Sequence, residues 1–329
     1  MATPARKAQH LEIAAEPGVV HLSGTGLDAV RLRHRALPGR DLADVVLETE
    51  LLGTTLAAPL VVSAMTGGTD AAAAVNGALA RAAAEHGVAM ALGSGRALLA
   101  DRELLRTYRC EARPPLLLAN LGAAGLEPEA AVELVALLEA DGLSIHLNAL
   151  QEAVQPEGTP AFGDALDRIA ACVRALAPLP VVVKEVGFGM DPEDVRALAD
   201  AGVAAVDVAG SGGTNWATIE GRRGDARAAA LAGAFADWGV PTARAVADAA
   251  AACPGLPAIA SGGLRDGVDV AKCLALGAVA GGSARPLLVA AQAGRASEAL
   301  QLLIDQLRIA VWACGAASAS AMDSSRLLA

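Results

Sequence analysis

The chain has 329 residues, enough for one large domain or two ordinary ones. It carries 26 basic and 36 acidic side chains, a formal charge of -10, which argues against nucleic acid as a partner because phosphate binding needs a basic face. No apolar run reaches the roughly 18 residues that cross a bilayer, and the N-terminal stretch lacks the apolar core of a signal peptide. We therefore expect a cytoplasmic protein with no membrane partner.

The five cysteines are scattered and form no CxxC pair. In a chain expected to be cytoplasmic, this pattern indicates buried free thiols rather than disulfides or a zinc site.

Residues 1–58 are mixed in composition and contain the basic side chains Arg6, Lys7 and His10. These three suggest a binding site for an anion. The alternative is a solvated basic terminus, which is the more common explanation for a lone Arg-Lys pair.

From Pro59 onward, short apolar runs alternate with helical patterns in which apolar residues recur about every 3.6 positions. Near-continuous apolar strands separated by helices indicate a parallel sheet covered on both faces. Helices are expected over 69–87, 127–142, 191–202, 266–278 and 294–316. The eight apolar runs fall at 59–64, 88–94, 115–122, 142–148, 180–187, 204–213, 257–263 and 278–285.

Eight strand–helix units predict a closed (β/α)8 barrel, the TIM barrel. An open, doubly wound sheet is the alternative, but its chemistry would gather at one switch point, whereas here nearly every strand ends in polar or glycine-rich residues. We predict an N-terminal extension (1–58) that crosses one end of the barrel, the barrel itself (59–316) and a C-terminal tail (317–329). The long connections 149–162 and 209–226 are expected to be lids or substrate loops.

The stretch after the fourth strand is unusually polar for so apolar a chain. It presents His146, Asn148, Gln151 and Glu152 within a few residues. Glu152, together with phosphate oxygens of a ligand, could hold Mg²⁺; the alternative is a carboxylate favoured by the start of a helix. Gln155 and Glu157, slightly further on, are expected to be loop residues.

Glycine-rich turns follow the seventh strand (261–267) and the eighth (281–285), each before a helix. Such turns form the usual phosphate site of a barrel, because backbone N–H groups and the helix dipole bind the anion, and Arg265 can add charge. Lys184 lies in the fifth apolar strand, and a lysine there either faces an electron-rich ligand or reaches solvent. Phosphate and lysine together suit flavin mononucleotide (FMN), with Thr66, Ser94 and Asn120 placed to hydrogen-bond its ring and ribityl chain.

Between about residues 6 and 290, the chain resembles the type 2 isopentenyl-diphosphate delta-isomerases. The matching stretches, in order, are RKAQHLEIA, APLVVSAMTGGT, IHLNALQEAVQPEG, VVVKEVGFGM, GSGGTNWATIEGRR and IASGGLRDGVDVAKCLALGA. The resemblance implies an enzyme of isoprenoid biosynthesis that interconverts isopentenyl and dimethylallyl diphosphate by adding one proton and removing another. It also implies reduced FMN as the group that transfers protons, NADPH to reduce it, Mg²⁺, and a homo-oligomer of four or eight subunits.

Carried onto this chain, the resemblance assigns Arg6, Lys7 and His10 to the substrate diphosphate and Glu152 to Mg²⁺. Gln151 contacts the substrate, and His146 and Asn148 line the same wall; these three are the candidate catalytic residues. The residues assigned to FMN are Ala64, Met65, Thr66, Ser94, Asn120, Lys184, Thr214, Gly262, Gly263, Arg265, Ser283, Ala284 and Arg285.

The chain departs from the family pattern at Gly95, at Thr159-Pro160 and at Ala209, so flavin and diphosphate contacts at these positions are expected to differ from those of the family. Two other functions stay open. An FMN-dependent oxidoreductase of a small 2-hydroxy acid would need a histidine late in the chain, but the last histidine is His146. A flavin- or phosphate-binding barrel without catalysis would not need Gln151 and Glu152.

Overall fold

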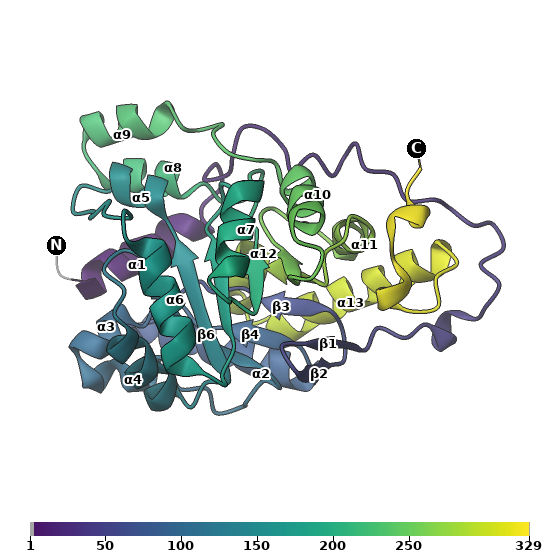
Figure 1. Ribbon diagram of the computed structural model, residues 1–329, viewed down its shortest axis with the longest axis horizontal. Coiled ribbons are helices and arrows are strands. Elements are labelled where there is room, and N and C mark those ends of the chain that lie inside the picture. The colour runs from purple at the N-terminus through teal and green to yellow at the C-terminus, as the bar shows by residue number, and fades with distance from the viewer. Residues whose placement is uncertain (1–2, 329) are drawn as a thin grey trace.

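The computed structural model describes residues 3–328, in which eight parallel strands close into a barrel surrounded by helices (Figure 1). The strands follow the order β10-β3-β4-β5-β6-β7-β8-β9 around the barrel. Each lies within one of the predicted apolar runs, so the predicted (β/α)8 barrel is confirmed. The strands are β3 (Leu60–Val62), β4 (Ala89–Ala91), β5 (Leu117–Gly122), β6 (Gly142–Leu147), β7 (Val181–Glu185), β8 (Ala205–Asp207), β9 (Ala258–Ala260) and β10 (Ala280–Ser283).

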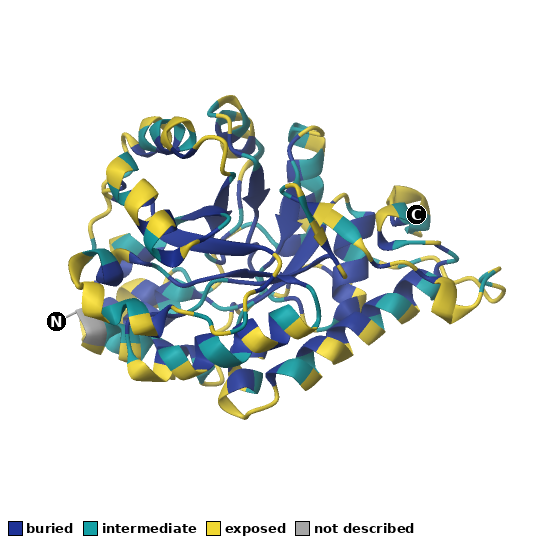
Figure 2. Cartoon of the chain, turned by 90° about the horizontal axis from the view of Figure 1, so that it is seen from below, coloured by how far each residue is buried: buried dark blue, intermediate teal, exposed yellow. Residues whose placement is uncertain are grey.

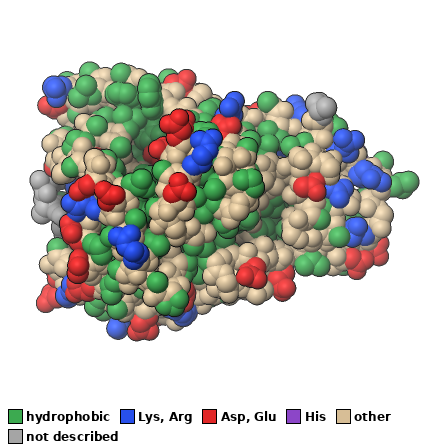
Figure 3. Space-filling view, viewed as in Figure 1, with side chains coloured by type: hydrophobic (Ala, Val, Ile, Leu, Met, Phe, Trp, Pro, Cys, Tyr) green, Lys and Arg blue, Asp and Glu red, His purple; other side chains and the backbone are tan. Residues whose placement is uncertain are grey.

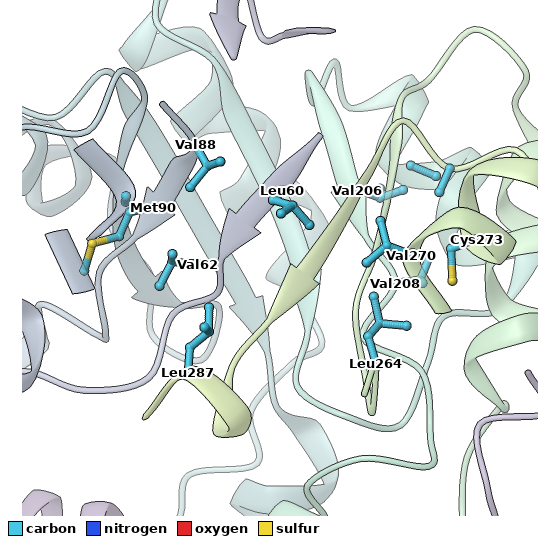
Figure 4. Close-up of a cluster of buried hydrophobic side chains, with 14 of the residues drawn as sticks. Leu60, Val62, Val88, Met90, Val206, Val208, Leu264, Val270, Cys273 and Leu287 are labelled. Atoms are coloured by element: carbon cyan, nitrogen blue, oxygen red, sulfur yellow. The ribbon is translucent and has the colours of Figure 1, made fainter. Parts of the chain in front are cut away.

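Both faces of the barrel wall are buried, which explains the near-continuous apolar runs. Successive residues of a strand point to opposite faces. In β3, Val61 packs inside the barrel with small residues such as Ala89, whereas Leu60 and Val62 pack outward against the helices. Figure 4 shows this outward layer, and Figure 2 shows buried strands beneath helices that expose their outer sides.

A short hairpin, β1 (Thr49–Leu51) and β2 (Thr54–Leu56), closes one end of the barrel. Leu51 and Leu56 are buried in the inner cluster with Val61 and Leu116, near the amino ends of the strands. The carboxyl ends of the strands are therefore the open end, as in other barrel enzymes.

Helices on the outside connect the strands, and the five helices predicted from the sequence are found as α2, α4, α7, α11 and α13. Three of them, α2, α7 and α11, begin after a capping side chain: for example, Thr69 accepts from Ala72 N–H, and Asp266 accepts from Asp269 N–H. The helices are α1 (Thr3–Ala15), α2 (Asp70–Glu85), α3 (Arg96–Ala100), α4 (Pro128–Leu138), α5 (Ala149–Val154), α6 (Ala165–Leu176), α7 (Pro192–Asp200), α8 (Trp216–Arg223), α9 (Ala226–Gly233), α10 (Thr242–Ala252), α11 (Gly267–Ala275), α12 (Arg285–Gln292) and α13 (Ala296–Ala313), with short 3-10 helices η1 (Leu42–Asp44), η2 (Arg102–Thr107), η3 (Ala319–Ala321) and η4 (Ser324–Arg326).

The long connections expected to be loops contain two of these helices. α5 lies in 149–162, and α8 lies in 209–226, where the Asn215 side chain caps it by accepting from Thr218 N–H. Both helices lie at the open end, on the side where α1 packs against α8, α12 and α2. The extension thus crosses the barrel mouth with its first helix.

The rest of the extension follows the outside of the barrel to the C-terminal tail (Figure 1). Leu32 forms a β-bridge with Leu327, and Val46 forms one with Ser318. All five cysteines are free thiols, but only Cys172, Cys273 and Cys314 are buried as expected, whereas Cys110 and Cys253 are partly exposed. Among the described residues, no helix has the length and apolar character to span a membrane. Figure 3 shows acidic and basic side chains mixed over one face of the molecule.

Candidate active site

Two adjoining cavities open at the carboxyl ends of the strands. The first, which we call the α1 cavity, lies beneath α1, and the second, the glycine cavity, lies against the turns after β8, β9 and β10. They contain about 1090 and 900 Å³ of space, part of it open to solvent, and they share Ala64, Met65, Lys184, Val186 and Trp216.

Every site residue predicted from the sequence lines one of these cavities. The α1 cavity has Arg6, Lys7, His10, Thr66, Ser94, Asn120, His146, Asn148, Gln151 and Glu152, besides the shared Ala64, Met65 and Lys184. The glycine cavity has Thr214, Gly262, Gly263, Arg265, Ser283, Ala284 and Arg285. Side chains from both ends of the sequence therefore meet in one place.

In the glycine cavity, backbone lies against backbone. Gly262 has a φ of +98°, and a Cβ there would lie 2.0 Å from the carbonyl oxygen of Gly210. Only glycine fits such a position without a shift of the backbone. The hydroxyl groups of Ser63 and Ser283 are buried in this region with no hydrogen-bond partner. The cavity therefore offers hydroxyl groups, exposed backbone and the start of α12 to an anion.

The two arginines of this cavity already have protein partners. The Arg265 guanidinium pairs with Asp28 and Asp269, both at 2.8 Å. The Arg285 guanidinium donates to the carbonyls of Ala14, Ala15 and Glu16, where α1 ends. Arginine is favoured at that position because the last carbonyls of a helix lack partners. Arg285 thus fixes α1 on the barrel, a role that the sequence did not suggest.

Lys184 lies on β7 between His146 on β6 and Asp207 on β8. It is buried, and its ammonium donates to the carbonyl of Glu185 at 2.6 Å. The Glu185 carboxylate accepts three backbone N–H groups of the turn that follows, those of residues 186–188. Burial raises the pKa of Glu185 to about 7, although these hydrogen bonds and Lys184 oppose the shift. The Glu185 carboxylate therefore stabilises the turn that follows Lys184.

His146 is neutral in this site. Its Nδ1 lies 2.8 Å from Oδ1 of Asn120, which can only accept, so Nδ1 carries the proton. Burial, helped by the charges of Lys184 and Arg96, lowers the His146 pKa to about 3. At neutral pH the ring can accept a hydrogen bond at Nε2 but has no second proton to give. The Nδ2 group of Asn120 is buried without a partner, a donor left for a ligand.

The polar wall of the α1 cavity is built on α5. Asn148 donates to Glu152 Oε1 at 3.0 Å, and Glu152 Oε2 accepts from Thr159 N–H at 2.8 Å. Gln151 donates from Nε2 to Glu220 Oε1 at 2.7 Å. Within residues 3–328, no cluster of three or more His, Cys, Asp or Glu side chains could hold a metal ion. A metal at Glu152 would therefore need oxygens from a ligand.

Glu220 is a residue that we did not predict. It is fully buried on α8, accepts from Gln151, and pairs with His10 at 2.8 Å and with Arg223. Burial would raise the Glu220 pKa, but the hydrogen bonds from His10 and Gln151 outweigh burial and hold the pKa below its ordinary value. The sequence signal that could have revealed this pair is the acidic residue followed by two basic residues in the stretch IEGRR. The expectation of a loop over 209–226 does not place Glu220 next to Arg223, whereas the helix α8 brings them together one turn apart.

Gln155 follows α5 in a bend, as expected of a loop residue, but it belongs to the site. This residue is buried at the end of α5 and lines the α1 cavity. With its amide oriented to satisfy its neighbours, it donates to Glu220 at 3.1 Å and accepts from Arg6 at 3.2 Å. Glu157 is in the turn that follows and pairs with Arg223 at 2.6 Å. The two residues differ because Gln155 directly follows the last residue of α5 and is buried, whereas Glu157 lies two residues further along the turn.

Comparison with known proteins gives consistent matches over nearly the whole chain. Residues 4–99 and 119–329 match the family model of FMN-dependent dehydrogenases. The chain is 46% identical to the isopentenyl-diphosphate delta-isomerase of Stutzerimonas stutzeri, over 98% of this chain and 96% of that protein. It is 48% identical to the protein of the same name from Xanthobacter autotrophicus, over 96% of this chain and 95% of that one.

Solved structures share the architecture at lower identity. A flavocytochrome b2 mutant with benzoylformate has a TM-score of 0.69 and 17% identity, over 97% of this chain and 82% of that one. Mandelate oxidase with benzoyl-formic acid has a TM-score of 0.63 and 25% identity, over 97% of this chain and 96% of that one. These likenesses support the barrel fold.

Proposed function

We propose that this protein interconverts isopentenyl and dimethylallyl diphosphate in isoprenoid biosynthesis. The premise is that the chain belongs to the isopentenyl-diphosphate delta-isomerases, within the FMN-dependent dehydrogenase family. One observation carries the proposal beyond family membership. Basic side chains of α1 share a cavity with Gln151, Glu152 and Lys184. A diphosphate with a short apolar chain needs these features: cations, a metal-binding carboxylate and a nearby flavin.

The residues present fit FMN. The unpartnered hydroxyls of Ser63 and Ser283 and the glycine turns suit a phosphate, and the unpartnered amide of Asn120 suits the polar edge of a ring. When bound and reduced, FMN would supply the proton transfer and an electron-rich ring. The residues proposed to hold it are Ala64, Met65, Thr66, Ser94, Asn120, Lys184, Thr214, Gly262, Gly263, Ser283 and Ala284, with Arg265 and Arg285 at the rim of the phosphate turn.

The chain's own side chains are proposed to bind and orient the substrate. Arg6, Lys7 and His10 would hold the diphosphate, and Glu152 would hold Mg²⁺ together with phosphate oxygens, as this ion prefers. Such positioning, with charge fixed in advance, contributes much of the catalysis in enzymes.

Gln151, His146 and Asn148 are the proposed catalytic wall. His146 is neutral and Glu220 is held ionised, so neither is suited to protonate an alkene. Glu220 instead fixes the Gln151 amide at the substrate. Trp216, edge-on to His10 with ring centroids 5.4 Å apart, lines both cavities and would help to exclude water from the reacting carbons.

Other parts of the proposal rest on the family resemblance alone. They are reduction of the flavin by NADPH and assembly of four or eight identical subunits. A cytoplasmic location is proposed from the sequence, whose scattered cysteines are typical of a reducing compartment. We also propose that residues 1–58 are an extension that completes the active site of the 59–316 barrel.

The test uses the purified protein and its flavin spectrum. Under nitrogen, the flavin is reduced with NADPH and isopentenyl diphosphate is added in deuterated water. Proton NMR should show dimethylallyl diphosphate with deuterium incorporated, and NADPH should not be consumed in proportion to turnover. A flavin that stays oxidised with the diphosphate but is reduced by a 2-hydroxy acid would instead favour an oxidoreductase. Bound FMN with neither reaction would contradict both enzymes.

A further inference from the structure

Tyr108, the only tyrosine of the chain, lies beneath α1 next to the α1 cavity. Its hydroxyl donates to the carbonyl of Ser94 at 2.7 Å and accepts from the Lys7 ammonium at 2.7 Å. Lys7 also donates to the same Ser94 carbonyl at 2.6 Å. The three groups form a closed triangle that joins α1 to two points of the connection between β4 and β5.

The tyrosine ring is held firmly in place. A Cβ on Gly67 would lie 2.1 Å from the ring, so the loop after β3 packs directly on it. The preceding residue, Thr107, accepts from Gly68 N–H at 2.9 Å through its hydroxyl, and its carbonyl accepts from Asn76 at 3.0 Å. The position of the Tyr108 hydroxyl is thus fixed by the same loop that lines the cavity with Met65 and Thr66.

Lys7 has one N–H left over. An ammonium has three donors; two are taken by Tyr108 and Ser94, and Lys7 lines the α1 cavity. Burial, with the charges of Arg6 and Arg96, lowers the Lys7 pKa to about 7. Two oxygen acceptors favour the charged form. Without them, this lysine would be both less ordered and less often charged.

We propose that Tyr108 is a positioning residue, which holds the Lys7 ammonium so that its remaining N–H points at an anionic diphosphate in the α1 cavity. The proposal rests on the function proposed above, in which Lys7 binds the substrate diphosphate. Tyr108 does not line either cavity, so it acts through Lys7 and not on the substrate itself.

The first test is Tyr108→Phe, which keeps the ring beneath Gly67 and removes only the hydroxyl. Loss of one hydrogen bond to a charged group should raise the KM for isopentenyl diphosphate about tenfold, with kcat, bound FMN and the midpoint of thermal unfolding little changed. The same change in a Lys7→Gln background should have no further effect on KM. An equal penalty in both backgrounds, or a loss of FMN or stability with KM unchanged, would overturn the proposal.

A second test needs no variant of Tyr108. Protein labelled with 3-fluorotyrosine has one ¹⁹F resonance, because the chain has one tyrosine. Lys7→Gln should shift that resonance, whereas Arg31→Gln, a change of charge on an exposed residue of the outer extension, should leave it in place. A resonance that is the same in Lys7→Gln and in the parent protein would show that the contact is absent in solution.

Binding of Mg²⁺-pyrophosphate separates this proposal from the proposed function. The dissociation constant can be measured by calorimetry whether or not the protein isomerises its substrate. If pyrophosphate binds about tenfold more weakly to Tyr108→Phe, the positioning role holds even where no isomerisation is found. If the affinity is unchanged while isomerisation proceeds, the role of Tyr108 is wrong and the function stands.

Discussion

Gln151 and Glu220 are joined by a hydrogen bond of 2.7 Å between α5 and α8. The same carboxylate pairs with His10 of α1 and with Arg223, so three helices from distant parts of the chain meet at one buried charge. The barrel supplies the floor of the site, and this carboxylate joins the helices that form its roof.

Removing this charge should destabilise the protein. Glu220→Gln keeps the shape but leaves Arg223, whose side chain is only 3% exposed, without its buried partner. Breaking a buried pair in this way costs about 3 kcal/mol in free energy of unfolding, which urea denaturation can measure. Glu157→Gln, the matched control, removes the more exposed partner of Arg223 and should cost less than about 1 kcal/mol. Equal losses in the two variants would contradict the role of Glu220.

The fold could be predicted from the sequence because burial leaves a strong local trace. β3 and the first three residues of β7 are apolar on both faces, and glycines and capping residues mark the turns between strands and helices. Glu220 could not be placed in this way. Only Arg223 lies on its own helix. His10 and Gln151 lie on α1 and α5, and nothing in the local pattern of 209–226 shows that they will meet a carboxylate there.

The two arginines of the glycine cavity show a second limit on what can be predicted from the sequence. A cation beside a phosphate turn can be recognised from the sequence, but its competing partners cannot. Asp28 of the extension accepts a hydrogen bond from Arg265, and the carbonyls at the end of α1 accept hydrogen bonds from Arg285. Both partners lie more than two hundred positions away, where no periodicity connects them to the turn.

His146 should make the protein less stable in acid. Its pKa is lowered from 6.5 to about 3, so below pH 6.5 the unfolded chain binds a proton that the folded chain does not. The free energy of unfolding then falls by about 1.4 kcal/mol for each pH unit down to about pH 3, and is unaffected by this group above pH 6.5.

The check compares urea denaturation at about pH 7 and pH 5. His146→Gln should lose about 2 kcal/mol less than the parent protein over this interval. His34→Gln, at an exposed histidine of the extension, is the matched control. If His146→Gln loses as much stability as the parent, the imidazole is not held neutral in the folded state.

The contact between Gly262 and Gly210 should be essential for flavin binding. Ala at 262 would place a Cβ 2.0 Å from a carbonyl oxygen at a φ of +98°, so the turns after β8 and β9 must move apart. We expect Gly262→Ala to purify with little FMN and to lose more than about 1 kcal/mol of stability. Flavin absorbance per chain and thermal unfolding measure both effects.

Gly233→Ala is the matched control for this change. It lies at the end of α9, where a Cβ meets nothing within 4 Å. Alanine should leave FMN bound and stabilise the protein by up to about 1 kcal/mol, because it restricts the unfolded chain. Full FMN content in Gly262→Ala would show that the glycine cavity is not the flavin phosphate site.

Glu152 should determine the dependence of activity on Mg²⁺. Its two oxygens are held by Asn148 and by the N–H of Thr159, at the edge of the α1 cavity. Glu152→Gln keeps the size of the side chain and removes its charge, so the Mg²⁺ concentration for half-maximal isomerisation should rise at least about tenfold. Bound FMN should be unchanged, because Glu152 is not among the residues proposed to hold the flavin.

Glu157→Gln is again the control, since this carboxylate lies five residues further along the same connection and pairs with Arg223 instead of lining either cavity. Its Mg²⁺ dependence should match that of the parent protein. The measurement is the initial rate of isomerisation across a Mg²⁺ titration at saturating substrate, with flavin absorbance recorded on the same samples. If Glu152→Gln has the same Mg²⁺ dependence as the parent protein, Glu152 is not a ligand of the metal, because no other change in the variant could compensate for the lost charge.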